Sequence, residues 1–175
     1  MAEGLELRTT TLGDLDDLQR LYREAFPDED LFPLVKDLLS GAAPLISLVA
    51  ITNGRVSGHV IFTFCSIEPG NVAAALLGPL CAAPDLQKTG IGSALVRAGF
   101  DKLASRNVAQ VMVLGDPGYY GRFGFKPDHA VETPCPIPDE WKDAWQSIRL
   151  DGADRTASGK LVVPDAWLDP ALWSA

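Results

Sequence analysis

The chain has 175 residues, a formal net charge of −8 at pH 7, and a composition that is 47% hydrophobic and 22% charged. This length and apolar content predict one folded domain with a hydrophobic core, and they exclude a chain that is disordered throughout. No segment approaches the ~18 consecutive apolar residues that span a bilayer. An acidic chain is a poor non-specific ligand for nucleic acid, so we expect neither a membrane nor a nucleic-acid partner.

The charge is unevenly distributed along the chain. Residues 1–30 carry nine acids and three bases, whereas residues 80–127 carry six bases and three acids. A locally positive stretch in an acidic protein can receive a small anion. The three cysteines are odd in number and widely spaced, which favours neither a disulfide framework nor a metal site. Residues 1–4 do not start the basic stretch followed by an apolar stretch that marks a signal peptide. Together with the cysteine pattern, this leads us to expect a reduced, cytoplasmic protein.

The spacing of apolar residues predicts alternating strands and helices. Thr11 and Asp14 form a capping pattern that marks the start of a helix, and Asn53-Gly54 is a strong hairpin signal. In chain order the expected elements are a strand over 6–9, helices over 12–26 and 29–40, strands over 45–52, 55–66 and 72–82, a helix over 90–105, a strand over 110–114, a helical piece over 119–123, and strands over 147–150 and 160–163. Residues 127–145 are rich in proline and are expected to be irregular.

Residues 72–82 are almost wholly apolar, which indicates a central strand buried on both faces. Gly78-Pro79 interrupts this strand, since proline cannot donate to a sheet ladder. The order of elements predicts an α/β (α+β) fold, with a mixed sheet and helices on its faces. We find no linker or repeat and expect one domain over residues 1–175.

Residues 80–94 contain the segment with the clearest chemistry: a buried strand, a polar turn with two glycines, and a long helix. The first amides of a helix have no partner within the helix, and the helix dipole places partial positive charge beside them. Glycine lets a ligand approach such amides closely. The sequence therefore predicts a phosphate site here, with Lys88, Thr89 and Ser93 as additional donors.

Several phosphate-binding patterns compete for this segment. No GxxxxGK[ST] string occurs in the chain, and the dinucleotide fingerprint GxGxxG lacks its third glycine, because Leu95 stands there. The pattern [QR]-x-x-G-x-[GA] fits fully, with Gln87, Gly90 and Gly92. This is the pyrophosphate loop of the GNAT acetyltransferase superfamily, which the chain resembles at this point. The remaining alternative is that the glycines only form a turn between strand and helix.

A second string strengthens the resemblance. Residues 115–125 read Gly-Asp-Pro-Gly-Tyr-Tyr-Gly-Arg-Phe-Gly-Phe, which resembles a bacterial subgroup of N-acetyltransferases. The resemblance covers residues 5–127 and is most specific over residues 78–127. It implies a GNAT fold, with a mixed, mostly antiparallel twisted sheet of six to seven strands and splayed central strands. Residues 72–127 would form the cofactor-binding core, and residues 128–175 a variable segment.

The resemblance also implies acetyl-CoA as co-substrate and no metal. Main-chain groups of Leu80, Cys81 and Ala82 would hold the pantetheine arm. The pyrophosphate would lie on the amides of Gln87, Lys88, Thr89, Gly90, Ile91, Gly92 and Ser93. Tyr120 occupies the position of the family's tyrosine acid, and a tyrosine with a pKa of about 10 stays protonated at neutral pH. Tyr119 is expected to pack.

The base that deprotonates the amine is left open by the sequence. Glu68 is one candidate, because some family members carry a glutamate just before the central strand. His59, Asp116 and a relay through water are the alternatives. Asp116 also has a purely structural explanation, since an Asp-Pro-Gly turn uses its carboxylate to bond its own backbone.

The implied reaction is direct transfer of an acetyl group to a primary amine of a small molecule or a polypeptide. The alternative is a non-catalytic acyl-CoA-binding sensor or interaction module on the same fold. The net charge of −8 favours a cationic acceptor. All four tryptophans, Trp141, Trp145, Trp167 and Trp173, fall in the variable segment. They are expected to pack in the core, wall an acceptor pocket, cover a sheet edge or form a homodimer contact.

Overall fold

The computed structural model describes residues 4–153 and 156–174. The expectation about a signal peptide falls on residues 1–4, of which only Gly4 lies within the described part. None of the helices in these two ranges is long and apolar enough to cross a membrane. The chain forms two compact units, the first built from Met1–Phe62 and Gly78–Lys102 and the second from Thr63–Leu77 and Leu103–Ala175. The expectation of a single domain stays a prediction.

Strands, α-helices (α) and 3-10 turns (η) alternate along the described residues. In chain order they are β1 (Leu5–Thr9), η1 (Leu12–Asp14), α1 (Leu15–Ala25), α2 (Phe32–Ser40), β2 (Leu45–Thr52), β3 (Arg55–Glu68), β4 (Val72–Ala82), η2 (Pro84–Leu86), α3 (Ile91–Ala104), β5 (Gln110–Leu114), α4 (Pro117–Tyr120), η3 (Gly121–Phe123), β6 (Lys126–Pro127), β7 (Val131–Glu132), η4 (Asp139–Ala144), β8 (Trp145–Arg149), β9 (Gly159–Val162), η5 (Asp165–Trp167) and α5 (Ala171–Ser174).

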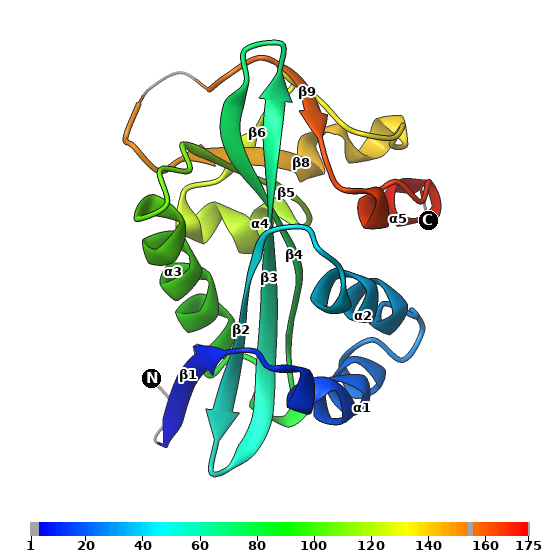
Figure 1. Cartoon of the computed structure of the whole chain (residues 1–175), viewed down its shortest axis with the longest axis vertical. Helices are drawn as coiled ribbons and strands as arrows, with labels where there is room; N and C mark the ends of the chain where they lie inside the picture. The colour runs from blue at the N-terminus through cyan, green and yellow to red at the C-terminus, as the bar shows by residue number, and fades with distance from the viewer. Residues whose placement is uncertain (1–3, 154–155, 175) are drawn as a thin grey trace. The chain divides into compact units, whose positions relative to one another are not determined.

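The first unit contains the strand order β1-β2-β3-β4. β1 runs antiparallel to β2, with Leu5 opposite Thr52. The predicted hairpin turn is present, since Asn53 and Gly54 both have positive φ, at 51° and 79°. Figure 1 shows α3 on one side of these strands and α1 and α2 on the other. The prediction of a sheet with helices on both faces is thus confirmed for this unit.

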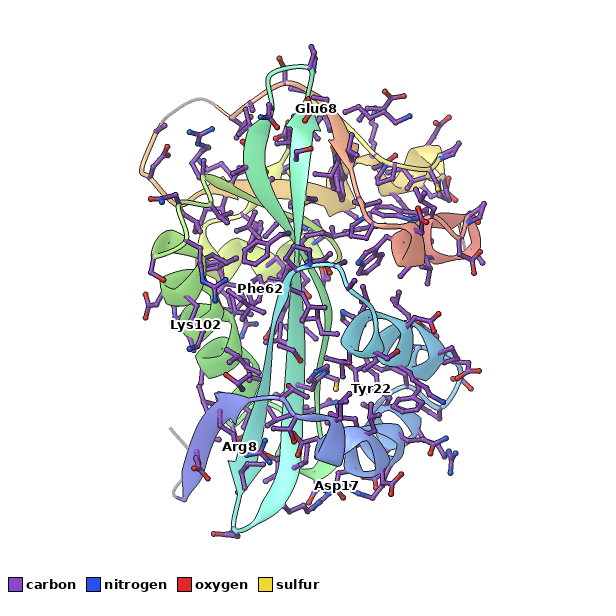
Figure 2. The ribbon with its side chains drawn as sticks, viewed as in Figure 1. Arg8, Asp17, Tyr22, Phe62, Glu68 and Lys102 are labelled. Carbon is purple, nitrogen blue, oxygen red and sulfur yellow. The ribbon has the colours of Figure 1, made fainter. Side chains whose placement is uncertain are left out.

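Close packing of α3 on β3 depends on glycine. A Cβ added to Gly58 would lie 2.6 Å from a methyl carbon of Ile91, and one added to Gly99 would collide with the ring of Phe62. Phe62 itself is fully buried near the middle of β3 (Figure 2). On the opposite face, α1 contributes Leu18, Leu21 and Tyr22 to the core. Both faces of the strands are therefore covered by apolar side chains.

The second unit contains the strand order β4-β5-β8-β6. β4 pairs with β5 in parallel, and β5 pairs with β8 antiparallel. The end of β3 pairs with β9, which in turn pairs with β7 in parallel. Most pairings of the fold are antiparallel, as the sequence predicted for this fold class.

Three of the four tryptophans lie in the core of this second unit. Trp145, Trp167 and Trp173 are at most 8% exposed. The indole N–H of Trp145 donates to the Val131 carbonyl at 2.8 Å, and that of Trp173 donates to the Trp167 carbonyl at 2.8 Å. Because their indole groups are satisfied inside the unit, these side chains serve core packing. Of the roles that the sequence left open for them, core packing is the one that this arrangement favours.

Several predicted boundaries differ from the structure. The helix expected over 12–26 begins with η1, because the Asp14 carboxylate accepts the Thr11 N–H at 2.7 Å and is also paired with Arg8 at 2.8 Å. The helix expected from residue 29 begins at Phe32, with Pro33 in its first turn, where proline is favoured. The described residues form nine strands, where six to seven were expected, because β6 and β7 are two residues long and so carry no periodic signal. The segment expected to be irregular contains β7 and η4.

Candidate functional site

The ladder between β4 and β5 ends where the sequence predicted an interruption. Their parallel pairing covers residues 74–77 and stops at Leu77, opposite Val113. Gly78 follows with φ of 144°, and the Gly78-Pro79 peptide bond is cis. Proline has no N–H to give to a neighbouring strand. From this point β4 has backbone groups that β5 does not use.

After Pro79, successive residues of β4 direct their main-chain N–H and C=O groups alternately toward β3 and away from it. The Ala83 N–H donates to the Ser57 carbonyl of β3 at 2.8 Å. In an antiparallel pair, residues that bond the neighbouring strand alternate with residues whose N–H and C=O point away from it. By this register Cys81 faces β3, whereas Leu80 and Ala82 direct their main-chain groups away from β3. Of the three residues expected to hold a ligand by main-chain bonds, these two have the required orientation.

The turn between β4 and α3 is open and strongly bent. Lys88 and Gly90 both have left-handed backbone, with φ of 65° and 92°. Residues 87–90 are exposed, and a Cβ added to Gly90 would have no heavy atom within 4 Å. The Thr89 hydroxyl donates to the Leu86 carbonyl and holds the turn. This combination of left-handed residues curls the backbone into a concave surface of amides.

These amides are available to a ligand. The first hydrogen bond of α3 runs from the Ala94 N–H to the Gly90 carbonyl at 3.0 Å. Within the described part of the chain, the seven amides of residues 87–93 donate to no protein acceptor. Such N–H groups at the start of a helix bind anions, and the helix dipole adds to the attraction. The residues present therefore fit a diphosphate, with Lys88 in the same turn.

Tyr120 lies at the end of the short helix α4, whose start is fixed by a side-chain cap. The Asp116 carboxylate accepts the Gly118 N–H at 2.9 Å and so caps α4, which supports the structural explanation of Asp116. The ring of Tyr120 packs against Gly115, where an added Cβ would lie 2.5 Å away, and edge-on against Phe125 at 5.8 Å. Burial raises the pKa of Tyr120 above its ordinary value of 10, so the hydroxyl is protonated at neutral pH.

Tyr119 differs from its neighbour in a way that fits packing. The guanidinium of Arg122 lies over its ring at 4.3 Å, and the Arg122 Nε–H donates to its carbonyl at 2.9 Å. The ring also meets the ring of Tyr120 edge-on at 5.0 Å. These contacts hold the ring of Tyr119 against Arg122 and Tyr120, which is a packing role.

Glu68 and Tyr120 are not brought together. Glu68 ends β3 at the turn that precedes β4 (Figure 2), whereas Tyr120 packs on Gly115 just beyond the far end of β5. The residues from Val72 to Leu77 separate the two ends, which is roughly 17 Å at about 3.3 Å per residue. The Glu68 carboxylate has no polar partner among the described residues.

His59 is fully engaged in the core and is not free to act as a base. Its Nδ1 lies 2.7 Å from the Tyr22 hydroxyl, and its Nε2 lies 2.8 Å from Ser47 Oγ. Burial lowers the pKa of His59 to about 3, so the ring is neutral at physiological pH. No group of three or more residues able to bind a metal occurs within residues 4–153 and 156–174.

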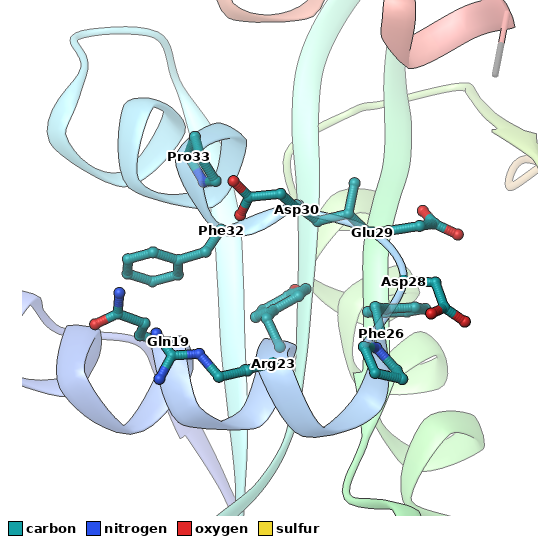
Figure 3. Close-up of a pocket in the computed structure, with 11 residues that line it drawn as sticks. Gln19, Arg23, Phe26, Asp28, Glu29, Asp30, Phe32 and Pro33 are labelled. Carbon is teal, nitrogen blue, oxygen red and sulfur yellow. The ribbon is translucent and has the colours of Figure 1, made fainter.

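Sequence reasoning did not identify a pocket between α1 and α2. It has a volume of about 460 Å³ and is lined by side chains from Gln19 to Pro33 (Figure 3). The available signal was the run of three acids at residues 28–30, directly after a helix-ending Pro27. Taken alone, that run only adds to the negative charge of residues 1–30.

Comparisons with known proteins identify the class of protein. The family model described as acetyltransferase (GNAT) domain matches residues 6–127. The chain is 32% identical over 163 residues to the uncharacterized N-acetyltransferase YjhQ of Escherichia coli K12, covering 89% of this chain and 90% of that protein. It is 31% identical over 147 residues to the uncharacterized N-acetyltransferase YhbS of the same strain, covering 83% and 86%. The chain therefore belongs to the GNAT acetyltransferase family, as its two motifs predicted.

Solved structures agree with this assignment. The structure of YhbS from Escherichia coli in complex with CoA superposes with a TM-score of 0.84 at 27% identity, covering 95% of this chain and 93% of that one. A GNAT acetyltransferase from Brucella melitensis in complex with acetyl-CoA gives a TM-score of 0.76 at 25% identity, covering 95% and 99%. The fold is that of the GNAT family, and these two neighbours bind CoA or acetyl-CoA.

Proposed function

We propose that this protein transfers the acetyl group of acetyl-CoA to a primary amine by direct attack of the amine on the thioester. The observation that carries the proposal is the row of seven unpaired amides at residues 87–93, at the start of α3. Structural neighbours with CoA and acetyl-CoA support it.

Acetyl-CoA would be held almost entirely by main-chain groups. The amides of residues 87–93 donate to the oxygens of the diphosphate, with Lys88 supplying a full positive charge. The N–H and C=O groups of Leu80 and Ala82, which point away from β3, bond the pantetheine arm. Ser93 can donate its hydroxyl at the same helix start. This arrangement binds the common part of any acyl-CoA and leaves the choice of acceptor to other residues.

The chemistry then needs one electrostatic stabiliser and one acid. The neutral amine nitrogen attacks the carbonyl carbon, and negative charge develops on the carbonyl oxygen. A main-chain N–H of β4, from Leu80 or Ala82, stabilises this oxyanion. The carbon–sulfur bond breaks, the thiolate takes the proton of Tyr120, and solvent restores that proton. The products are the acetylated amine and CoA.

The proton lost by the amine goes to water in this proposal. Asp116 is used as a helix cap, and both nitrogens of His59 are bonded in the core. Glu68 stands about 17 Å along the strands from the region of Tyr120. Glu68 could therefore accept the proton of the amine only through a chain of water molecules. Bulk water can accept that proton without Glu68.

Turnover with a panel of amines tests the proposal. The protein is incubated with acetyl-CoA and butylamine, putrescine, spermidine, lysine or a short peptide, and release of the CoA thiol and the acetylated product are measured. We expect thiol release that depends on at least one amine. Calorimetric binding of acetyl-CoA without thiol release for any amine would favour a non-catalytic acyl-CoA sensor. Absence of binding would contradict both functions.

A further inference from the structure

Gln146 is a fully buried amide beside the segment that carries Tyr120. It is 0% exposed, and in the ladder between β5 and β8 it stands opposite Val113. Its Nε2 group donates to the Gly115 carbonyl at 3.0 Å and to the Ala144 carbonyl at 3.2 Å. Because both partners are acceptors, it is the nitrogen of the amide that faces them.

The oxygen of the same amide is in a different situation. Among the buried side-chain nitrogen and oxygen atoms of residues 4–153 and 156–174, Oε1 of Gln146 alone has no hydrogen-bond partner. A buried polar atom without a partner is costly and calls for an explanation. Packing alone would be served as well by an apolar side chain of the same length. The amide is therefore explained by its N–H group and by what that group holds.

The N–H group of Gln146 holds the backbone just past the end of β5. The last pair of the ladder is Leu114 with Trp145, and the Gly115 N–H then donates to the Ala144 carbonyl at 3.0 Å. Since the Gly115 carbonyl is bonded to Gln146, both main-chain groups of Gly115 are tied to the segment around β8. The side chain of Gln146 thus extends the connection between β5 and β8 to the residue that precedes the cap of α4.

Gly115 is also the surface on which the ring of Tyr120 lies. A Cβ added to Gly115 would be 2.5 Å from Cε2 of that ring, so the ring lies directly against the Gly115 backbone. The Tyr120 hydroxyl makes no hydrogen bond with another residue that the structure describes. The position of the hydroxyl is therefore set by the contacts of the ring, and a shift of the Gly115 peptide would move it.

We propose that Gln146 is a positioning residue for Tyr120, because its bond to the Gly115 carbonyl fixes the backbone on which the ring of Tyr120 lies. The proposal rests on the proposed function, in which Tyr120 protonates the leaving thiolate. Displacement of a catalytic group by about 1 Å can cost about 100-fold in rate. Loss of the Gln146 N–H group should therefore reduce kcat and leave the binding of acetyl-CoA unchanged, since that binding is assigned to β4 and the turn before α3.

Variants of Gln146 and of a second buried glutamine test the proposal. Gln146→Met keeps the length of the side chain without its N–H group, and Gln146→Asn keeps the amide but is too short to reach Gly115. For each variant that folds, as urea denaturation shows, we expect kcat to fall about tenfold or more, with KM for acetyl-CoA changed by less than about threefold. Gln110→Met is the matched control, because Gln110 is also fully buried and its Nε2 group donates to Met112 and Asp128. Its kcat should stay within about threefold of the wild type.

A double-mutant cycle separates positioning from a general loss of structure. In Tyr120→Phe the acid is absent, so a shift of the ring has little left to change. In that background we expect Gln146→Met to lower kcat by less than about twofold, against about tenfold or more in the wild type. Equal losses in the two backgrounds would overturn the proposal, because the effect of Gln146 would then not act through Tyr120.

Fluorine NMR tests the positioning without turnover. The chain has three tyrosines, so the signals of protein grown with 3-fluorotyrosine are assigned by replacing each tyrosine with phenylalanine. Gln146→Met should shift the signal of Tyr120 and leave that of Tyr22, which lies in the first unit, unchanged. An unshifted Tyr120 signal would overturn the proposal whether or not the protein transfers acetyl groups. A shifted signal in a protein that releases no CoA thiol with any amine would support the positioning and reject the proposed function.

Discussion

The Tyr22 hydroxyl lies 2.7 Å from Nδ1 of His59, at a place in the core where Tyr22 is 1% and His59 is 0% exposed. The other ring nitrogen, Nε2, lies 2.8 Å from Ser47 Oγ, which itself donates to Thr10 Oγ1 at 2.7 Å. Since the Ser47 proton is used on Thr10, Nε2 carries the imidazole proton and Nδ1 accepts from Tyr22. One neutral tautomer of His59 is therefore built into the core beside Cys81.

Removing the Tyr22 hydroxyl should destabilise the protein. In Tyr22→Phe, Nδ1 of His59 stays buried without a donor, and we expect a loss of ~1–3 kcal/mol in the free energy of unfolding. Urea denaturation measures this loss. Tyr119→Phe is the control, because the Tyr119 hydroxyl makes no hydrogen bond among the described residues. Equal stability of wild type and Tyr22→Phe would contradict the hydrogen-bond chain.

The buried His59 should make stability depend on pH below neutrality. Its pKa is about 3 in the folded protein and near 6.5 in the unfolded chain. Between these values the unfolded state binds the extra proton, so the free energy of unfolding falls as the pH drops from about 6.5 toward 3. Asp14, with its pKa lowered to about 2 by Arg8, adds a loss only below its ordinary value of 3.8. Urea midpoints at about pH 7.5 and about pH 5 isolate the histidine, and His59→Gln should reduce the difference between them.

The loop before α3 should lose its ligand when a negative side chain is added. In Gly92→Asp, the carboxylate repels the diphosphate and adds bulk at the amides, and we expect the affinity for acetyl-CoA to fall about 100-fold or more. Calorimetry measures the affinity directly. Gly70→Asp places the same side chain on the exposed turn after β3 and should bind acetyl-CoA as the wild type does. Unchanged affinity in Gly92→Asp would reject the assignment of the loop.

Tyr120 should affect turnover and leave cofactor binding intact. Tyr120→Phe removes the acid that protonates the leaving thiolate, and general acids contribute about 100-fold or more to rate. We expect kcat to fall by about that factor, with KM for acetyl-CoA changed by less than about threefold. Tyr119→Phe provides the matched control. Full activity of Tyr120→Phe over the whole pH range would show that another group supplies the proton.

Glu68 should be dispensable for the reaction. Glu68→Gln retains the shape of the side chain and removes its basicity, and we expect kcat/KM within about twofold of the wild type. The comparison is made from about pH 6 to about pH 9, where a missing base would change the profile. A fall of about 100-fold that is confined to the low-pH side would instead identify Glu68 as the base.

The sequence predicted the local parts of the fold well. The Asn53-Gly54 hairpin, with φ of 51° and 79°, follows from turn chemistry within a few residues. Pairing between distant strands was beyond such reasoning. The end of β3 pairs with β9 almost 100 residues later. Nothing in the sequence of either strand indicates which strand it pairs with. The strands β6 and β7 are too short to show alternation.

The same distinction applies to the site. The phosphate loop is one contiguous strand–turn–helix segment, so its residue types and spacing were enough to predict it. The His59 chain joins residues that are 37 and 12 positions apart, and only the folded structure brings them together. The acidic run at residues 28–30 can be seen in the sequence. Only the folded structure shows that this run lines a pocket together with side chains of α1 and α2.

A crystal structure of the protein with acetyl-CoA tests the central claim most directly. We predict diphosphate oxygens within about 2.7–3.2 Å of several main-chain nitrogens of residues 87–93, with the pantetheine arm bonded to Leu80 and Ala82. A diphosphate bound elsewhere, with the amides of this turn facing only solvent, would contradict the account.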